Sequence, residues 1–138
     1  MIYKQLFIDS DVILDMLLTR EPFWGYSQLL FIESPNRRIV LNTSTLVIAN
    51  VNYILTKKIG ASAAKNSIKA LVKRINILPF ESDIIDLALI SEFSDLEDGI
   101  QYLIAERYKC DAIITRNIKD YKQSTIPVLT AEQFLRTL

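Results

Sequence analysis

The sequence predicts an α/β domain in which helices cover both faces of a parallel sheet. Short apolar runs recur along the chain and segments with helical periodicity separate them, which is the order of elements in parallel α/β folds. Polar residues also gather directly after the apolar runs, as they do at the carboxyl ends of parallel strands. The 138 residues indicate a single domain, residues 1–138, with a core of ordinary size.

Five short apolar segments are expected to form the strands. The first ends abruptly at a run of polar residues, which is typical of a buried strand that reaches the edge of its sheet. Pro79 closes the third, because proline cannot donate a hydrogen bond to a neighbouring strand. The expected strands lie at residues 5–8, 38–41, 75–78, 112–115 and 127–129.

Capping and turn residues bound the expected helices. Thr43 or Ser44 caps the third helix and Gly60 ends it. Thr130 and Gln133 have the spacing of a capping box for the last helix. The other helices are expected at residues 12–18, 22–34, 61–73, 82–93 and 96–108.

The second helix is expected to begin at Pro22, whose ring suits a first helical turn. Its apolar residues are expected to face the core, namely Phe23, Leu29, Leu30 and Ile32.

Charge is balanced in total but uneven along the chain. Sixteen Lys and Arg offset sixteen Asp and Glu, while residues 57–74 hold only basic charges and residues 81–98 only acidic ones. In the helix at 61–73, Ile68, Leu71 and Val72 are expected inside. Lys65 and Lys69 then lie outside, either on an ordinary solvated face or on a stripe that contacts nucleic-acid phosphates.

The composition excludes several kinds of functional site. Without histidine, the chain has no Ser-His-Asp or Cys-His nucleophile system, no HExxH zinc site and no Cys2His2 finger. The single cysteine, Cys110, excludes an internal disulfide, and only three glycines argue against a P-loop. The cysteine usage suits a reducing cytosol and no apolar run is long enough to span a membrane, so a cytoplasmic protein without a membrane partner is expected.

Asp9, Ser10 and Asp11 follow the first strand and are candidates for a site at the edge of the sheet. Either acid could simply cap the helix that follows. Two carboxylates this close repel each other unless a cation or a basic group joins them.

A second acidic group, Asp95, Glu97 and Asp98, begins the helix at 96–108. Capping accounts for part of this group, but three acids in four positions exceed what a cap requires. The excess of negative charge indicates a hard divalent cation such as Mg²⁺ or Mn²⁺.

A third polar group follows the fourth strand and consists of Thr115, Arg116, Asn117 and Asp120. Asn117 could instead cap the short turn at 118–121, and Asp120 could lie on the surface. The position after a strand places the group near Asp9.

Asn50 lies on the same helical stripe as Leu46, Tyr53 and Ile54 and is therefore expected to be buried. It is either a core asparagine with satisfied hydrogen bonds or a side chain beside a polar cavity.

Four segments together resemble the PIN-domain family in order and spacing: residues 6–15 (LFIDSDVILD), 95–101 (DLEDGIQ), 110–121 (CDAIITRNIKDY) and 126–135 (IPVLTAEQFL). The resemblance implies a three-layer α/β/α domain around a central parallel sheet. It further implies a metal-dependent endoribonuclease, as in VapC-type toxins, which are often homodimers and are inhibited by an antitoxin protein.

The resemblance also implies the roles of single residues. Asp9 and Asp98 would bind Mg²⁺ or Mn²⁺, with Asp120 as a third metal ligand, while Asn117 occupies the position of the fourth family acid. Asn50 stands where the family has a glutamate, and Asp11 could partly restore that charge. Supporting roles fall to Ser10 and Thr115, and RNA binding to Arg116, Lys65 and Lys69.

Two other functions also fit parts of the sequence. Because Asn50 lacks a carboxylate, the chain could be a PIN module that binds RNA or a protein partner without cleaving. A phosphatase of the haloacid-dehalogenase type, using Asp9 and Asp11, is disfavoured because Ile13 stands where that motif has Thr or Val.

Overall fold

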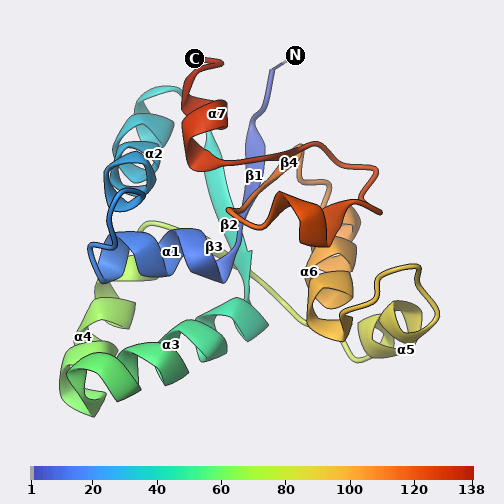
Figure 1. Cartoon of the computed structure of the whole chain (residues 1–138), viewed down its shortest axis with the longest axis horizontal. Helices are drawn as coiled ribbons and strands as arrows, with labels where there is room; N and C mark the ends of the chain where they lie inside the picture. The colour runs from blue at the N-terminus through green and yellow to red at the C-terminus, as the bar shows by residue number, and fades with distance from the viewer. Residues whose placement is uncertain (1) are drawn as a thin grey trace.

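The computed structural model describes residues 2–138. Its centre is a parallel sheet of five strands, as the sequence predicts, and their order is β3-β2-β1-β4-β5 (Figure 1). The strands are β1 (Gln5–Ile8), β2 (Val40–Ser44), β3 (Asn76–Leu78), β4 (Ala112–Ile114) and β5 (Val128–Leu129).

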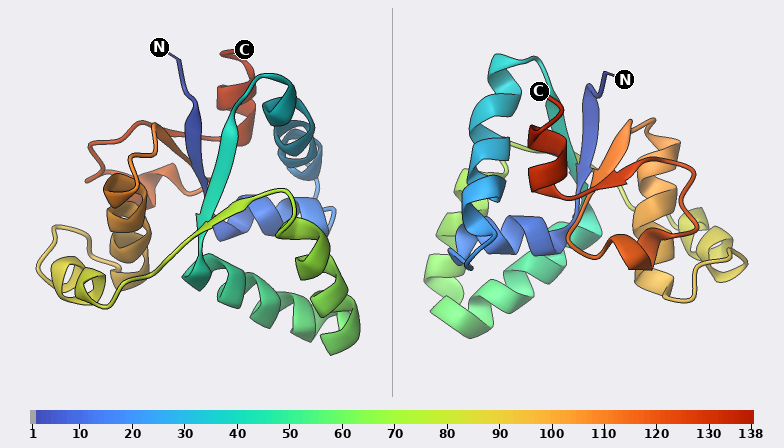
Figure 2. Two further views of the ribbon diagram at one scale, coloured as in Figure 1. Left: turned by 180° about the vertical axis from the view of Figure 1, so that it is seen from behind. Right: turned by 45° about the horizontal axis from the view of Figure 1, so that its top comes forward.

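Helices flank the sheet on both sides and complete three layers. The helices are α1 (Ser10–Leu17), α2 (Trp24–Asn36), α3 (Thr45–Ile59), α4 (Ala61–Leu71), α5 (Asp83–Leu89), α6 (Leu96–Arg107) and α7 (Ala131–Leu135), with a short 3-10 helix η1 (Ile118–Tyr121). Figures 1 and 2 show α1, α2 and α7 on one side of the sheet and α5 and α6 on the other. α3 and α4 pack against each other beyond the carboxyl ends of the strands.

The strand order creates a switch point between β1 and β4. From β1 the chain moves outward to β2 and β3, and it then returns to place β4 on the other side of β1. Polar groups at a switch point can converge, because the connections on the two sides depart in opposite directions. β1 and β4 are also the most buried strands, with Leu6, Phe7 and Ile8 of β1 fully inaccessible.

Local capping follows the sequence closely. Ser44 caps α3 by accepting a hydrogen bond from the amide of Val47 at 3.0 Å. Thr130 and Gln133 form the expected capping box of α7. Gly60 ends α3 with a positive φ of 89°, a backbone conformation that glycine adopts at little cost.

The prediction for the second helix is wrong in two respects. α2 begins at Trp24, and Pro22 lies in the preceding turn. Of the four residues expected in the core only Leu30 is buried, whereas Leu29 and Ile32 are each 46% exposed and Phe23 is 37% exposed.

The buried stripe of α2 instead combines apolar residues with serines, namely Ser27, Leu30, Phe31 and Ser34. Ser34 is accommodated because its hydroxyl donates to the carbonyl of Leu30 at 2.6 Å. Small residues allow α2 to approach α1 and α7, so hydrophobicity alone selects the wrong face.

Three boundaries also differ from the expectations. β2 begins at Val40, because Arg38 has a positive φ of 59° that breaks an extended strand. α5 ends at Leu89, four residues before Phe93, and Val72 is exposed beyond the end of α4. Within residues 2–138, no helix combines the length and the hydropathy needed to cross a membrane.

Candidate active site

Asp9 and Thr115 lie side by side because they directly follow the paired strands β1 and β4. Ile8 is in register with Ile114, and the amide of Asp9 donates to the Ile114 carbonyl at 3.0 Å. The Thr115 hydroxyl donates to Oδ2 of Asp9 at 3.0 Å. The third polar group of the sequence therefore does lie near Asp9.

The Asp9 carboxylate accepts hydrogen bonds from several directions. Its Oδ1 caps α1 by accepting from the amide of Ser10 at 2.8 Å, and its Oδ2 also accepts from the Tyr121 hydroxyl at 3.1 Å. Burial nevertheless raises the pKa of Asp9, and the charge of Glu97 adds to the effect. Asp9 can therefore cap α1 with one oxygen and take part in a polar site with the other.

Asp11 is the second carboxylate at this edge of the sheet. Its Oδ2 accepts from the amide of Arg116 at 3.0 Å and from Nδ2 of Asn117 at 3.1 Å. Its Oδ1 is buried and has no hydrogen-bond partner within residues 2–138. Burial and the nearby charge of Asp9 raise the pKa of Asp11 to about 6, so this carboxylate lacks part of the compensation that its charge requires.

Asn117 does not cap the turn that follows it, since η1 has no side-chain cap hydrogen bond. Its amide group instead holds Asp11. The alternative that Asn117 only caps a turn is wrong.

The start of α6 brings a third carboxylate to the site. Asp95 caps the helix by accepting from the amide of Asp98 at 2.9 Å, which leaves Glu97 and Asp98 free of that role. Burial first, and then the surrounding negative charges, raise the pKa of Asp98 to about 7. Those charges belong to Asp95, Asp9, Asp120 and Glu97. The acidic site is defined here as Asp9, Asp11, Glu97, Asp98 and Asp120.

Asn50 is half-buried and not a core residue. The expected stripe is wrong because α3 buries Val47, Val51 and Leu55, while Tyr53 and Ile54 are exposed. Nδ2 of Asn50 donates to Oε1 of Glu97 at 2.7 Å. Asn50 therefore does not supply a carboxylate but fixes one on the neighbouring helix, at a point where it affects both Asp9 and Asp98.

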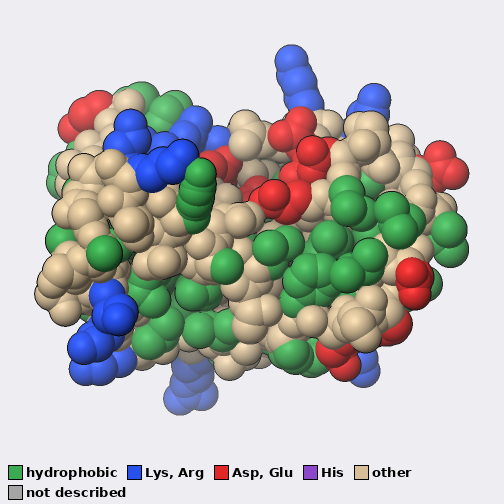
Figure 3. Space-filling model, turned by 90° about the horizontal axis from the view of Figure 1, so that it is seen from below, with side chains coloured by type: hydrophobic (Ala, Val, Ile, Leu, Met, Phe, Trp, Pro, Cys, Tyr) green, Lys and Arg blue, Asp and Glu red, His purple; other side chains and the backbone are tan. Residues whose placement is uncertain are grey.

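A cavity of about 390 Å³ opens beside Asp98 and Asp120. Lys119 and Lys122 also line it, so the site has basic side chains within reach of a phosphate. Figure 3 views the molecule from the carboxyl ends of the strands and shows acidic side chains around a hollow with basic ones nearby.

The basic residues assigned to RNA binding have different positions. Nε and an outer nitrogen of Arg116 contact Asp15 at 2.7 and 3.0 Å, so its guanidinium is already paired. Lys65 and Lys69 are on α4, which Figures 1 and 2 show on the opposite side of the molecule from α6. A role for these three residues in RNA binding stays a prediction.

Several residues of this region escaped the sequence interpretation. Tyr121, Lys119 and Lys122 carry no local signal, because only the η1 turn brings them to β1 and α6. Asp15 did carry a local signal in the sequence, because an acid on the buried stripe of an apolar helix needs a charged partner. Glu97 was recognised as part of an acidic group without a role.

The donor chemistry of the acidic site suits a divalent cation. All candidate ligands are oxygens, which Mg²⁺ and Mn²⁺ prefer, and the raised pKa values of Asp11 and Asp98 reflect burial and uncompensated repulsion. Within residues 2–138, no three acidic side chains already enclose a position for a metal ion.

Comparisons with known proteins show which family and which relatives the chain resembles. The family model described as PIN domain matches residues 5–119. The chain is 34% identical over 137 residues to Ribonuclease VapC1 of Aquifex aeolicus (strain VF5), covering 95% of this chain and 93% of that protein.

Two solved structures show a similar fold. One is a chain of a toxin-antitoxin complex from Klebsiella pneumoniae, with a TM-score of 0.67, 22% identity, and coverage of 91% of this chain and 97% of that one. The other is VapC20 of Mycobacterium tuberculosis, described as a sarcin-ricin loop cleaving toxin, with a TM-score of 0.65, 15% identity, and coverage of 78% and 86%.

Proposed function

Since the chain belongs to the PIN-domain family, we propose that it is a metal-dependent endoribonuclease of the VapC type and that the acidic site is its catalytic centre. The observation that carries this proposal is that carboxylates from the end of β1, the start of α6 and η1 lie close enough for their charges to act on Asp98, where burial and this repulsion raise the pKa to about 7. The similarity to Ribonuclease VapC1 supports the reaction class.

Asp9, Asp98 and Asp120 would hold the Mg²⁺ or Mn²⁺ ion. A divalent cation supplies acidification of water and neutralisation of phosphate charge, which the chain needs because it contains no histidine to serve as a base. Attack of a water oxygen on the phosphorus would break the bond to the sugar 3′ oxygen, which would leave and take up a proton, and the RNA phosphodiester would be hydrolysed.

The remaining residues orient this centre. Thr115 and Tyr121 donate to the same oxygen of Asp9 and fix the direction of that carboxylate. Burial and the charge of Asp9 raise the pKa of Tyr121, so its hydroxyl stays protonated and remains a donor. Ser10 contributes its backbone amide to Asp9.

Asn50 stands where the family has a glutamate, but a carboxylate, that of Glu97, lies beside it. Asn50 holds the Glu97 side chain by a 2.7 Å hydrogen bond, and the charge of Glu97 acts on both Asp9 and Asp98. We infer that Glu97 supplies the carboxylate that Asn50 lacks. This favours an active enzyme over a PIN module that binds without cleaving.

Two partners belong to the same proposal. An antitoxin protein is supported by similarity to toxins crystallised as toxin-antitoxin complexes, including VapBC2 from Rickettsia felis. A homodimer is supported by apolar side chains that remain exposed around α5 and the start of α6. These are Ile85, Leu87, Leu89, Ile90 and Leu96.

RNA cleavage with and without Mn²⁺ tests the function. Asp9→Asn and Asp98→Asn should each lower the rate at least about a hundredfold, as expected when one charged group of a catalytic centre is lost. Asp86→Asn is the matched control, because Asp86 is an exposed acid on α5. Unchanged cleavage by both site variants would refute the assignment of the centre.

A further inference from the structure

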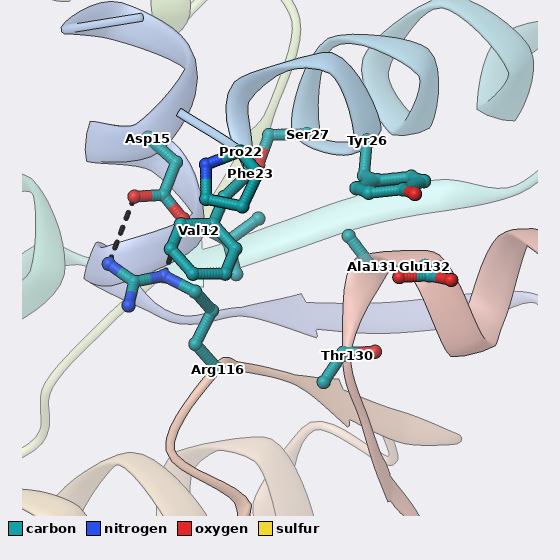
Figure 4. A pocket seen from close by; sticks show the side chains of 10 residues that line it. All are labelled: Val12, Asp15, Pro22, Phe23, Tyr26, Ser27, Arg116, Thr130, Ala131 and Glu132. Carbon is teal, nitrogen blue, oxygen red and sulfur yellow. Dashed lines mark hydrogen bonds and ion pairs between the residues drawn. The ribbon is translucent and has the colours of Figure 1, made fainter. Parts of the chain in front are cut away.

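A second cavity, distinct from the acidic site, lies between the start of α2, the middle of α1 and the start of α7. Its volume is about 360 Å³, within the range of small-molecule sites. Figure 4 shows the side chains that border it, with Phe23 and Arg116 on one side and Tyr26 on another.

The cavity offers flat surfaces for stacking. Phe23 and Tyr26 are each 37% exposed and both line it. The guanidinium carbon of Arg116 lies 4.1 Å from the centroid of the Phe23 ring, so one planar group is already stacked there. Aromatic rings and arginine planes are the surfaces on which proteins stack unpaired bases.

The charges that line the cavity are already paired, which disfavours an anionic ligand. Arg116 pairs with Asp15, and Glu132 accepts from Arg136 at 2.8 Å. A phosphate placed here would have to compete with carboxylates for the arginines. The occupant is therefore expected to be flat and uncharged.

The cavity also presents a hydroxyl group. Ser27 is 1% exposed and lines the cavity. A serine hydroxyl can both donate and accept a hydrogen bond. The nitrogen or oxygen at the edge of a base can pair with this hydroxyl, whereas an aliphatic side chain cannot.

The cavity adjoins the acidic site. Arg116 joins the two, because its backbone amide contacts Asp11 while its guanidinium contacts Asp15. These two acids are separated by about 6 Å along α1, given a rise of about 1.5 Å per residue. A strand with one phosphate at the acidic site can therefore place a neighbouring base in the cavity.

We propose that this cavity binds one unpaired nucleobase of the RNA substrate, stacked on Phe23 and Tyr26 and hydrogen-bonded to Ser27, beside the phosphate that is cleaved. The proposal rests on the ribonuclease function proposed above and adds a base-recognition subsite to it. Cleavage is accordingly confined to single-stranded or looped RNA and depends on the base at this position.

Nucleosides test the subsite separately from catalysis, because they carry no phosphate. The chain has a single tryptophan, Trp24, adjacent to Phe23, so its fluorescence should report titration with each of the four ribonucleosides. Wild-type protein should show saturable binding of at least one. Phe23→Leu, which keeps apolar volume but removes the ring, should weaken it about tenfold, and Phe23→Tyr should retain it.

Matched controls separate a lost subsite from a damaged fold. Leu29→Ala alters an exposed residue of α2 outside the cavity and should leave nucleoside binding unchanged. Mn²⁺ affinity should be the same in Phe23→Leu and wild type, while the preference among homopolymeric RNAs should be lost in Phe23→Leu through KM more than through kcat.

The outcomes distinguish this proposal from the one on which it rests. Metal-dependent RNA cleavage without nucleoside binding, or with base preference unchanged in Phe23→Leu, would overturn the subsite alone. Nucleoside binding without RNA cleavage would reject the ribonuclease function alone. A change in Trp24 fluorescence on addition of a protein partner, with no change on addition of any nucleoside, would also overturn the subsite.

Discussion

Two acids on one helix, Asp11 and Asp15, occupy opposite situations. Asp15 is 1% exposed and is bound by Arg20 at 2.8 Å and by Arg116 at 2.7 Å. Asp11 is held only by neutral donors, faces the charge of Asp9 and keeps one oxygen unpartnered. The difference teaches that the partner, more than the depth of burial, decides whether a carboxylate stabilises the fold or is available for function.

The largest expected effect is on stability at the paired acid. Asp15→Asn would leave two arginines without their carboxylate and should lower the free energy of unfolding by about 3 kcal/mol, since breaking a buried ion pair is costly and the arginines are only partly exposed. Urea unfolding measures it.

Glu132→Gln provides the comparison for that experiment, because the pair of Glu132 with Arg136 is solvent-exposed. It should cost less than about 1 kcal/mol. Equal effects of the two substitutions would show that burial of the Asp15 pair does not matter.

The unpaired acid should behave in the opposite way. Asp11→Asn should raise the free energy of unfolding at neutral pH by about 2 kcal/mol in the absence of divalent ions, because it removes a buried charge with raised pKa. A loss of stability as large as that of Asp15→Asn would contradict the comparison.

The pH dependence of the stability of the wild-type protein tests the behaviour of Asp11 without any substitution. The folded pKa of Asp11 is about 6 and its ordinary value is 3.8, so the folded chain binds more protons. Its contribution to stability is therefore greatest below about pH 4 and is lost as the pH rises through 6. Asp11→Asn should flatten this part of the curve measured by urea unfolding.

A smaller effect of the same sign is expected at Asp98, whose pKa is about 7. Asp98→Asn should stabilise the metal-free chain at pH 8 by about 1 kcal/mol, a value discounted because the carboxyl is only partly buried and solvent screens its charge. Mn²⁺ should raise the thermal midpoint of wild type but not of Asp98→Asn. A similar Mn²⁺ response in both would remove Asp98 from the cation site.

The smallest effect concerns the pair between α3 and α6. Glu97→Gln and Asn50→Ala should each lower Mn²⁺ affinity about three- to tenfold, measured by calorimetric titration, because one removes a carboxylate and the other releases it. The double variant should be no worse than Glu97→Gln alone. Fully additive losses would mean that Asn50 acts independently of Glu97.

Much of this fold was predictable because its signals are local. β1 is only four residues long, so its signal lies within a few positions of the chain. The caps at Ser44 and Thr130 and the end of α3 at Gly60 likewise depend on residues within one or two helical turns. The face of α2 was not predictable in this way. Its serines fit the core only because α1 and α7 approach closely, which exposes Leu29 and Ile32.

The candidate site also contains features that the local sequence predicts and features that it does not. The sequence placed Asp9, Thr115 and Asp98 at the ends of elements, and composition without histidine directed attention to carboxylates. It did not show that Asn50 would meet Glu97, or that Arg116 would pair with Asp15. Each of those contacts joins residues far apart in the chain.

Local signals in the sequence specify the alternation of strands and helices, the caps, and the presence of acids after strands. Hydrogen bonds within a turn and burial of apolar runs act over a few residues, so they can be read in order along the chain. Only the tertiary structure decided which acids are paired and which repel. That decision depends on the return of the chain to place β4 beside β1, which pairs the guanidinium of Arg116 with Asp15 while neutral hydrogen-bond donors hold Asp9 and Asp11.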